Sequence, residues 1–267
     1  MRPSALQCGW LGRHFDFRLP AIVNFVGGGG KTSLILSLLR EYAEVCSVLY
    51  TTTTRIHPPE VLDGLAIIST DDASLLKHLV NQVGRRFQDQ RCRLVATRAS
   101  AGRALLRGVE PDFARSIERE CFPLILNEAD GARTMSIKYP REGEPVLMEG
   151  AEYLVPVIGL DCLDRPLGPE TLFRWELAEA SLSLQRGEPL TPGLAARILL
   201  HPSGVCKNWK PGSHIMVFIN KVDLPSQDFA AMALAHALLH NQEYPVEKVV
   251  WGSLEHRRAN AMQAPVQ

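Results

Sequence analysis

Four consecutive glycines followed by lysine and threonine are the clearest candidates for chemistry in this chain of 267 residues. They lie in residues 23–33, VNFVGGGGKTS, between a short apolar run and an amphipathic segment. A glycine loop between a strand and a helix can aim backbone N–H groups at a phosphate, because glycine has no side chain to block the approach. Lys31 would reach the outer phosphates, and the Thr32 hydroxyl would ligate Mg²⁺. The predicted phosphate-binding residues are Gly27, Gly28, Gly29, Gly30, Lys31, Thr32 and Ser33.

This stretch is a shortened form of the P-loop pattern G-x-x-x-x-G-K-[ST]. Phe25 occupies the position of the first glycine in that pattern, so G-x-x-G-K-T remains at residues 27–32. The shorter form resembles the loop of Mur-type ligases. A flexible glycine linker is the alternative interpretation. We favour the loop, because linkers are seldom placed between an apolar strand and an amphipathic helix.

Acidic residues follow a second apolar run, at residues 123–133, PLILNEADGAR. In a P-loop enzyme an acid at a strand end holds Mg²⁺ through water or orients the attacking nucleophile. Glu128 and Asp130 are two positions apart, so they share a face if the strand continues. We therefore take Lys31, Glu128 and Asp130 as candidate catalytic residues, and Thr32 with Glu128 as the candidate metal ligands. An exposed turn with two incidental acids is the alternative.

A third pattern, N-K-x-D at residues 220–223, directly follows the apolar run 215–219. It matches the motif with which GTP-binding proteins recognise guanine. The aspartate there accepts hydrogen bonds from guanine N1 and N2, which adenine cannot donate in the same way. The motif therefore favours GTP and leaves ATP open, whereas the alternative is a polar turn between strand and helix. The candidate base-binding residues are Asn220, Lys221 and Asp223, with residues 252–253 as a second base-contacting loop.

Four further residues are candidates for contacting a polar substrate. Thr53 and Thr54 end an expected strand, and ligands of open parallel sheets bind outside such carboxyl ends. Lys138 opens a polar, proline-containing loop just after the acidic residues, and Arg174 begins a helical segment. The β-propensity of threonine and an ordinary exposed charged loop explain the same residues without any ligand.

Alternating strands and helices are expected to position these groups. Apolar runs predict strands at residues 21–26, 47–53, 65–69, 93–97, 124–126, 152–160, 215–219 and 247–251. Helical patterns lie at residues 33–45, 73–84 after an Asp71 or Asp72 cap, 111–122, 172–187, 191–204 and 228–242, and a loop is expected at residues 55–59. The predicted fold class is α/β. We expect a P-loop NTPase-like, mainly parallel sheet with helices on both faces and a helical insertion at about residues 161–211.

Composition narrows the class of protein. Lysine plus arginine equal aspartate plus glutamate at 29 each, so neither a nucleic-acid stripe nor a polybasic membrane surface is indicated. The six cysteines form no C-x-x-C pair and are interpreted as reduced thiols. Without a signal peptide or an apolar run of roughly 18 residues, a cytoplasmic protein is expected. We expect an N-terminal extension at residues 1–20, a nucleotide-binding domain at 21–254 and a frayed tail at 255–267.

In their order and spacing, these motifs resemble the YqeC-type family. The resemblance rests on FVGGGGKTS, TTTTRIHPP, LNEADGARTMSIKYPREGEPV, VIGLDCLDRPL with FRWE, and INKVD, and it covers about residues 21–252. The family is described as accessory to selenium-dependent molybdenum hydroxylases, in selenium cofactor biosynthesis. The resemblance implies GTP or ATP with Mg²⁺ as cofactors and a molybdenum hydroxylase, or its cofactor, as partner. It picks out residues 27–32 and 52–54, Glu128, Asp130, Gly131, Lys138, Glu144, Arg174, Asn220, Lys221 and Asp223.

Two kinds of function are compatible with these residues. In the first, an NTP-dependent enzyme, Lys31 and the loop amides hold the β- and γ-phosphates while the terminal phosphate is hydrolysed or transferred. In the second, a nucleotide-regulated cofactor carrier or metallochaperone, the nucleotide state moves loops and intrinsic catalysis is slight. A degenerate loop domain that binds no nucleotide is the third possibility.

Overall fold

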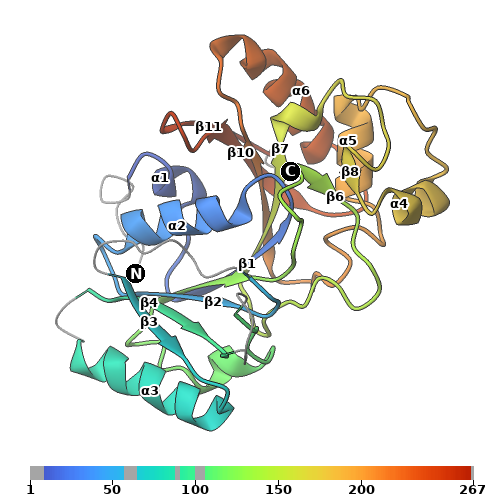
Figure 1. The fold of residues 1–267 in the computed structure, drawn as a ribbon. Helices are drawn as coiled ribbons and strands as arrows, with labels where there is room; N and C mark the ends of the chain where they lie inside the picture. The colour runs from blue at the N-terminus through green and yellow to red at the C-terminus, as the bar shows by residue number, and fades with distance from the viewer. Residues whose placement is uncertain (1–8, 57–64, 88–90, 100–105, 266–267) are drawn as a thin grey trace. The chain divides into compact units, whose positions relative to one another are not determined.

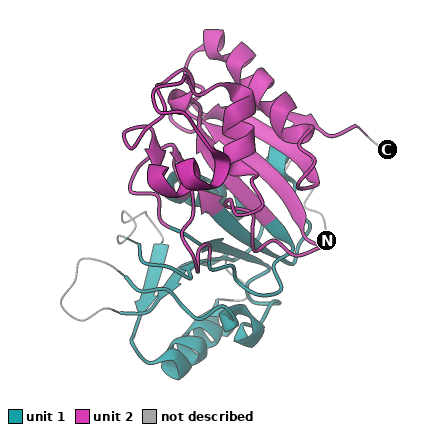
Figure 2. Ribbon diagram, turned by 90° about the vertical axis from the view of Figure 1, so that its right-hand side faces the viewer, with its two compact units in different colours: residues 1–25, 32–130, 146–153 teal, residues 26–31, 131–145, 154–267 magenta. Residues whose placement is uncertain are grey.

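The computed structural model describes residues 9–56, 65–87, 91–99 and 106–265. Part of the predicted loop at residues 55–59, and residues 1–8 of the predicted N-terminal extension, lie outside these ranges. The chain forms two compact units, each assembled from segments far apart in the sequence (Figure 2). Unit 1 comprises residues 1–25, 32–130 and 146–153, and unit 2 comprises residues 26–31, 131–145 and 154–267. Both are α/β with mainly parallel strands, as the sequence predicts.

Unit 1 contains a parallel sheet in the order β1-β5-β2-β4-β3. All five strands are predicted from apolar runs, and β1, β2 and β5 are buried along their whole lengths, as parallel strands usually are. The register pairs Glu128 with both Phe25 and Thr52, so the carboxyl ends of three strands meet at one edge. The strands are β1 Ala21–Gly27, β2 Val48–Thr52, β3 Leu65–Ser69, β4 Arg93–Thr97 and β5 Leu124–Glu128.

Two longer helices, α2 Lys31–Tyr42 and α3 Ala73–Arg86, lie on opposite faces of this sheet (Figure 1). The side chain of Asp72 caps α3 as predicted, accepting from the backbone N–H groups of Ser74 at 2.8 Å and Leu75 at 3.0 Å. A four-residue helix, α1 Gly12–Phe15, precedes β1. One hydrophobic cluster joins α3 to the sheet, through Leu76 and Val80 of the helix and Leu49, Leu94 and Ile125 of the strands.

The helix predicted at residues 111–122 is wrong, because only a short 3-10 helix, η1 Phe113–Ser116, forms there. Its apolar residues are buried, as the helical pattern suggested, but the backbone turns extended at Ile117. The side chain of Asn81 in α3 bonds to backbone groups that a continuing helix would pair within itself. Its amide donates to the Ser116 carbonyl at 2.8 Å and accepts from the Glu118 N–H at 3.0 Å.

Unit 2 contains strands in the order β11-β10-β9-β7, in which β9 and β10 are parallel and β10 and β11 antiparallel. The predicted frayed tail is therefore wrong for β11, which pairs with β10 along its whole length. The β11 segment contains mainly polar and small residues and no apolar run, so no strand was predicted there. The strands are β7 Tyr153–Gly159, β9 His214–Asn220, β10 Val246–Ser253 and β11 Arg258–Gln263.

The predicted helical insertion contains two eight-residue helices, one within each of the helical segments predicted there. A short strand within it, β8 Leu172–Phe173, pairs in parallel with β6 Ile137–Lys138 and so joins the insertion to the segment after the acidic residues. The predicted helix after the N-K-x-D pattern is α6, which packs on α5 and β10 (Figure 1). The helices are η2 Leu160–Cys162, α4 Trp175–Leu182, α5 Pro192–Leu199, η3 Pro225–Gln227 and α6 Asp228–Leu239. No helix in the described ranges is long and apolar enough to cross a bilayer.

Candidate functional site

The glycine loop joins β1 to α2, as predicted, and its backbone is held tightly within unit 2. The N–H groups of Gly28 and Gly29 donate to the carbonyls of Val157 and Met135, each at 2.9 Å. A Cβ at Gly28 would lie 2.5 Å from the Met135 oxygen, and one at Gly29 would lie 2.1 Å from Gly159 N. These N–H groups are thus bonded to the protein, so a phosphate at this loop would have to be met by the N–H groups of the first turn of α2, which have no intrahelical acceptor.

Lys31 is buried and curls back over the loop, with its Nζ donating to the Gly27 carbonyl at 2.6 Å. Gly27, Gly29 and Gly30 have φ of 95°, 74° and 109°, a region that favours glycine. The Lys31 ammonium group therefore lies against the glycine loop, within reach of the N-terminus of α2.

The end of β9 is fastened to this loop through Asn220. Its Nδ2 donates to the Gly29 carbonyl at 2.7 Å, and a Cβ at Gly30 would lie 2.7 Å from the same nitrogen. The structure thus brings the first and third sequence patterns together within unit 2. The asparagine of the N-K-x-D pattern supports the loop, which is the role expected from GTP-binding proteins.

Lys221 has a left-handed backbone, φ 61°, which costs a non-glycine residue on the order of 1 kcal/mol. Its Nζ donates to Ser136 Oγ at 2.7 Å and to Asp161 Oδ2 at 2.8 Å. Neither partner was predicted. Asp161 could have been found by the rule that identified Glu128, because it also follows a buried strand, β7.

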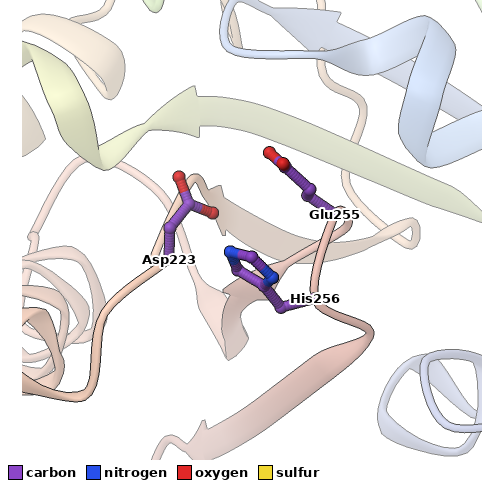
Figure 3. A group of neighbouring side chains, drawn as sticks. All are labelled: Asp223, Glu255 and His256. Carbon is purple, nitrogen blue, oxygen red and sulfur yellow. The ribbon is translucent and has the colours of Figure 1, made fainter.

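Asp223 is bound by the end of β10, since Ser253 Oγ donates to its Oδ1 at 2.7 Å. The same hydroxyl accepts from the His256 N–H at 3.0 Å. Figure 3 shows Asp223 from the segment after β9 beside Glu255 and His256 from the turn after β10, and one ligand atom of each lies within 4.8 Å of the others. In the part of the chain that the structure describes, this is the group of three side chains able to hold a metal ion. Glu255 and His256 were missed because they fall in the predicted tail.

The predicted metal ligands, Thr32 and Glu128, come together in unit 1. Glu128 ends β5 and is buried, and its Oε2 accepts from Thr32 Oγ1 at 2.9 Å. The Tyr50 hydroxyl donates to the same oxygen at 3.1 Å and was not predicted. Burial raises the pKa of Tyr50 well above its ordinary value, and the negative charge of Glu128 adds to this. The phenol therefore stays protonated and holds the carboxylate in place.

Asp130 is completely buried, two residues beyond the end of β5. Because the strand stops at Glu128, the condition under which Glu128 and Asp130 would share one strand face is not met. The structure supports Glu128 rather than Asp130 as the partner of Thr32.

The threonines at the end of β2 bond within unit 1. The Thr53 hydroxyl donates to the Val146 carbonyl and accepts from Asn127 Nδ2 at 3.2 Å. The Thr54 N–H donates to Thr52 Oγ1 at 3.0 Å. The substrate contacts of Thr53 and Thr54 stay a prediction, and Thr53 would have to give up an internal bond to make one.

Lys138 and Arg174 meet at one carboxylate in unit 2. Glu144 accepts from Lys138 Nζ at 3.1 Å and from both Arg174 NH groups at 2.6 and 2.9 Å, and Arg141 Nε lies 2.9 Å away. Burial disfavours the carboxylate, but hydrogen bonds from Arg174 and the charge of Lys138 outweigh it and lower the pKa of Glu144 to about 2. Three cations thus surround one anion, with the Arg174 guanidinium 4.8 Å from the centre of the Phe173 ring.

The molecule is thus an α/β protein that combines a strand–glycine loop–helix element, a buried acid at a strand end and an N-K-x-D turn. A family model described as YqeC protein matches residues 23–176, more than half of the chain, and the protein belongs to that family. It is 28% identical over 246 residues to an Escherichia coli (strain K12) protein called "Uncharacterized protein YqeC", a match that covers 91% of each chain. No solved structure matches the chain significantly. The family expected from the sequence motifs is confirmed, and neither name states an activity.

Proposed function

We propose that this protein binds GTP or ATP with Mg²⁺ and hydrolyses or transfers the terminal phosphate. The observation that carries the proposal is the bond from Asn220 to the Gly29 carbonyl, 2.7 Å. It joins a glycine loop suited to phosphate with a turn suited to a purine base, and a nucleotide is the ligand that needs both. The family resemblance adds the setting, maturation of the selenium-containing cofactor of a molybdenum hydroxylase.

The phosphate end of the site would be served by the first turn of α2 and by Lys31. The N–H groups of that turn, which have no acceptor within the helix, and the positive end of the helix dipole favour an anion there. Lys31 would exchange the Gly27 carbonyl for a phosphate oxygen, a charge-assisted bond stronger than the one it gives up. Catalysis would then rest on positioning and on stabilisation of developing charge.

The spacing of Thr32 Oγ1 and Glu128 Oε2 fits Mg²⁺. Mg²⁺ holds oxygen ligands at about 2.1 Å in octahedral geometry, which places neighbouring ligands about 3.0 Å apart. The two oxygens are already 2.9 Å apart through their hydrogen bond. A metal ion could therefore replace the bond with little movement, while Tyr50 keeps the carboxylate oriented. Thr32 follows Lys31 directly in the chain, as a P-loop requires.

The base end favours guanine. Ser253 donates to Asp223 Oδ1 and so fixes the rotation of the carboxylate. Guanine presents two adjacent N–H donors to such a carboxylate, whereas adenine presents none in that arrangement. Hydrogen bonds to a charged group contribute about 1.5–3 kcal/mol, so this aspartate alone could supply a marked preference for GTP.

The test is nucleotide binding and turnover by the Lys31→Ala variant, with Lys210→Ala as a control that removes an exposed lysine elsewhere in unit 2. Isothermal titration calorimetry with GTP and ATP measures affinity, and phosphate release measures turnover. We expect Lys31→Ala to lose turnover and to bind more weakly, while Lys210→Ala behaves as the parent. Normal hydrolysis by Lys31→Ala would refute the assignment. Absence of binding of either nucleotide to the parent protein would establish the degenerate-loop alternative.

One observation favours a nucleotide-regulated carrier as a second candidate. The Lys31 ammonium is bonded to the Gly27 carbonyl, so phosphate binding must move the lysine and release this carbonyl of the loop. The same rearrangement would act on the segments that contact it, residues 135–136 and 157–159. Turnover measured with and without a molybdenum hydroxylase separates the two. Hydrolysis that appears only with the hydroxylase supports the carrier, and hydrolysis by the protein alone supports the enzyme.

A further inference from the structure

A polar pocket of about 180 Å³ opens beside Lys221, entirely within unit 2. It is lined by residues 134–136, by residues 161, 162, 165, 170 and 171, and by Lys221 itself. The lining contains cations, carboxylates and hydroxyls, namely Lys221, Arg165, Asp161, Glu170, Ser136 and Thr171. Of the candidate phosphate- and base-binding residues, Lys221 is the one that lines this pocket.

The pocket shares its walls with the glycine loop. The Met135 carbonyl accepts from the Gly29 N–H at 2.9 Å, and the Ser136 carbonyl accepts from the Gly159 N–H at 2.9 Å. The Ser136 side chain extends from that wall to Lys221 Nζ, 2.7 Å away. Only the backbone of residues 135–136 would therefore separate a ligand in the pocket from the glycine loop that is proposed to hold phosphate.

Lys221 also lies between the two ends of the proposed nucleotide site. Asn220, the residue before it, bonds to the glycine loop, and Asp223, two residues after it, is the candidate base reader. A nucleotide with its phosphates on the loop and its base at Asp223 must carry its sugar past Lys221. The left-handed backbone of Lys221 turns the chain at this point.

Size and chemistry indicate which part of a nucleotide the pocket accepts. A volume of about 180 Å³ is below the roughly 300 Å³ of a pocket for a whole ligand. It suits a sugar ring better than a base with its sugar and phosphates. Sugar hydroxyls donate to carboxylates and accept from ammonium or guanidinium groups, and the lining offers both kinds of partner.

We infer that this pocket receives the ribose of the bound nucleotide, and that Asp161 and Glu170 accept hydrogen bonds from its hydroxyls. The inference rests on the proposed nucleotide site. Asp161 is paired with Lys221 at 2.8 Å, which orients it, and the exposed Glu170 lines the same pocket. The protein would then discriminate ribonucleotides from deoxyribonucleotides at residues outside the P-loop and N-K-x-D patterns.

The experiment compares GTP with its 2′-deoxy and 3′-deoxy analogues, and ATP with the same analogues, by calorimetry. Label-free titration is required, because fluorophores attached to the ribose would occupy the position under test. We expect the ribonucleotide to bind about tenfold more tightly than at least one deoxy analogue, since the lost bond is to a charged group. Glu170→Gln and Asp161→Asn should reduce that ratio toward one while the affinity for the affected deoxy analogue changes little.

Glu179→Gln is the matched control, because it neutralises an exposed glutamate of α4 that does not line the pocket. Its discrimination ratio should equal that of the parent protein. Equal affinity of the parent for all three forms of a nucleotide that binds would refute the ribose inference and leave the proposed function standing. An unchanged ratio in both pocket variants would also refute it. Absence of binding of every nucleotide would refute the proposed function itself.

Discussion

Replacing Glu144 by glutamine should destabilise the protein by about 3 kcal/mol at neutral pH. The Lys138 side chain is fully buried and the Glu144 side chain is 12% exposed, so the substitution leaves a buried ammonium group without its carboxylate. The pKa of Glu144 falls from 4.5 to about 2 in the folded protein. That shift corresponds to about 3 kcal/mol, at roughly 1.4 kcal/mol for each pH unit. Breaking a buried ion pair by removing one partner costs a similar amount.

The direction in which this stability contribution changes with pH follows from the lowered pKa of Glu144. Because the pKa of Glu144 is lower in the folded protein, its contribution is fully present above about pH 4.5 and is lost as the pH falls toward 2. Urea denaturation of the parent and of Glu144→Gln should therefore differ by about 3 kcal/mol at pH 7. The difference should shrink steadily between pH 4.5 and pH 2.

Glu142→Gln is the control, because it removes an exposed carboxylate from the same loop. It should change the free energy of unfolding by less than about 0.5 kcal/mol, as surface substitutions usually do. A loss below 1 kcal/mol for Glu144→Gln at pH 7 would contradict the electrostatic reasoning. So would a difference between parent and variant that stays constant from pH 4.5 to pH 2.

Two further predictions concern the loop and the base. Gly29→Ala should lower the free energy of unfolding by about 2 kcal/mol or more, because the new Cβ meets Gly159 N and the φ of Gly29 is 74°. Gly131→Ala is the control and should be nearly neutral, because no atom lies within 4 Å of a Cβ placed there. Equal denaturation midpoints for the two variants would count against the crowding at Gly29. Asp223→Ala should abolish any preference for GTP over ATP in a competition titration, and an unchanged preference would remove this residue from base reading.

The parts of the fold that the sequence predicts well are those with strong local signals. All eight predicted strands form, because each combines an apolar run with flanking turn residues. The glycine loop lies where the pattern places it, because the positive φ angles of Gly27, Gly29 and Gly30 are ones that glycine adopts without steric cost. Asp72 caps α3 because its side chain satisfies helix N–H groups regardless of the tertiary context.

The misses have non-local causes. The expected helix after Pro111 fails because Asn81, some thirty residues earlier, satisfies its backbone groups instead. β11 has little apolar signal of its own and forms because it pairs with the edge of β10.

Site residues were missed for the same reason. Tyr50 and Ser136 join the site only through contacts made across the fold, to Glu128 and Lys221 respectively. Each of the two units is assembled from three separate segments, so their boundaries could not be read from composition along the chain.

The backbone bonds that hold Gly28 and Gly29 have a consequence for how the family can diverge. Met135 and Val157 contact the loop through their carbonyl oxygens, which every amino acid possesses. Selection for loop shape therefore acts on the glycines and not on the side chain at position 135. Substitutions at residues 28–29 should disturb the loop itself, whereas substitutions of Met135 should leave the loop backbone in place and act on the pocket that this residue lines.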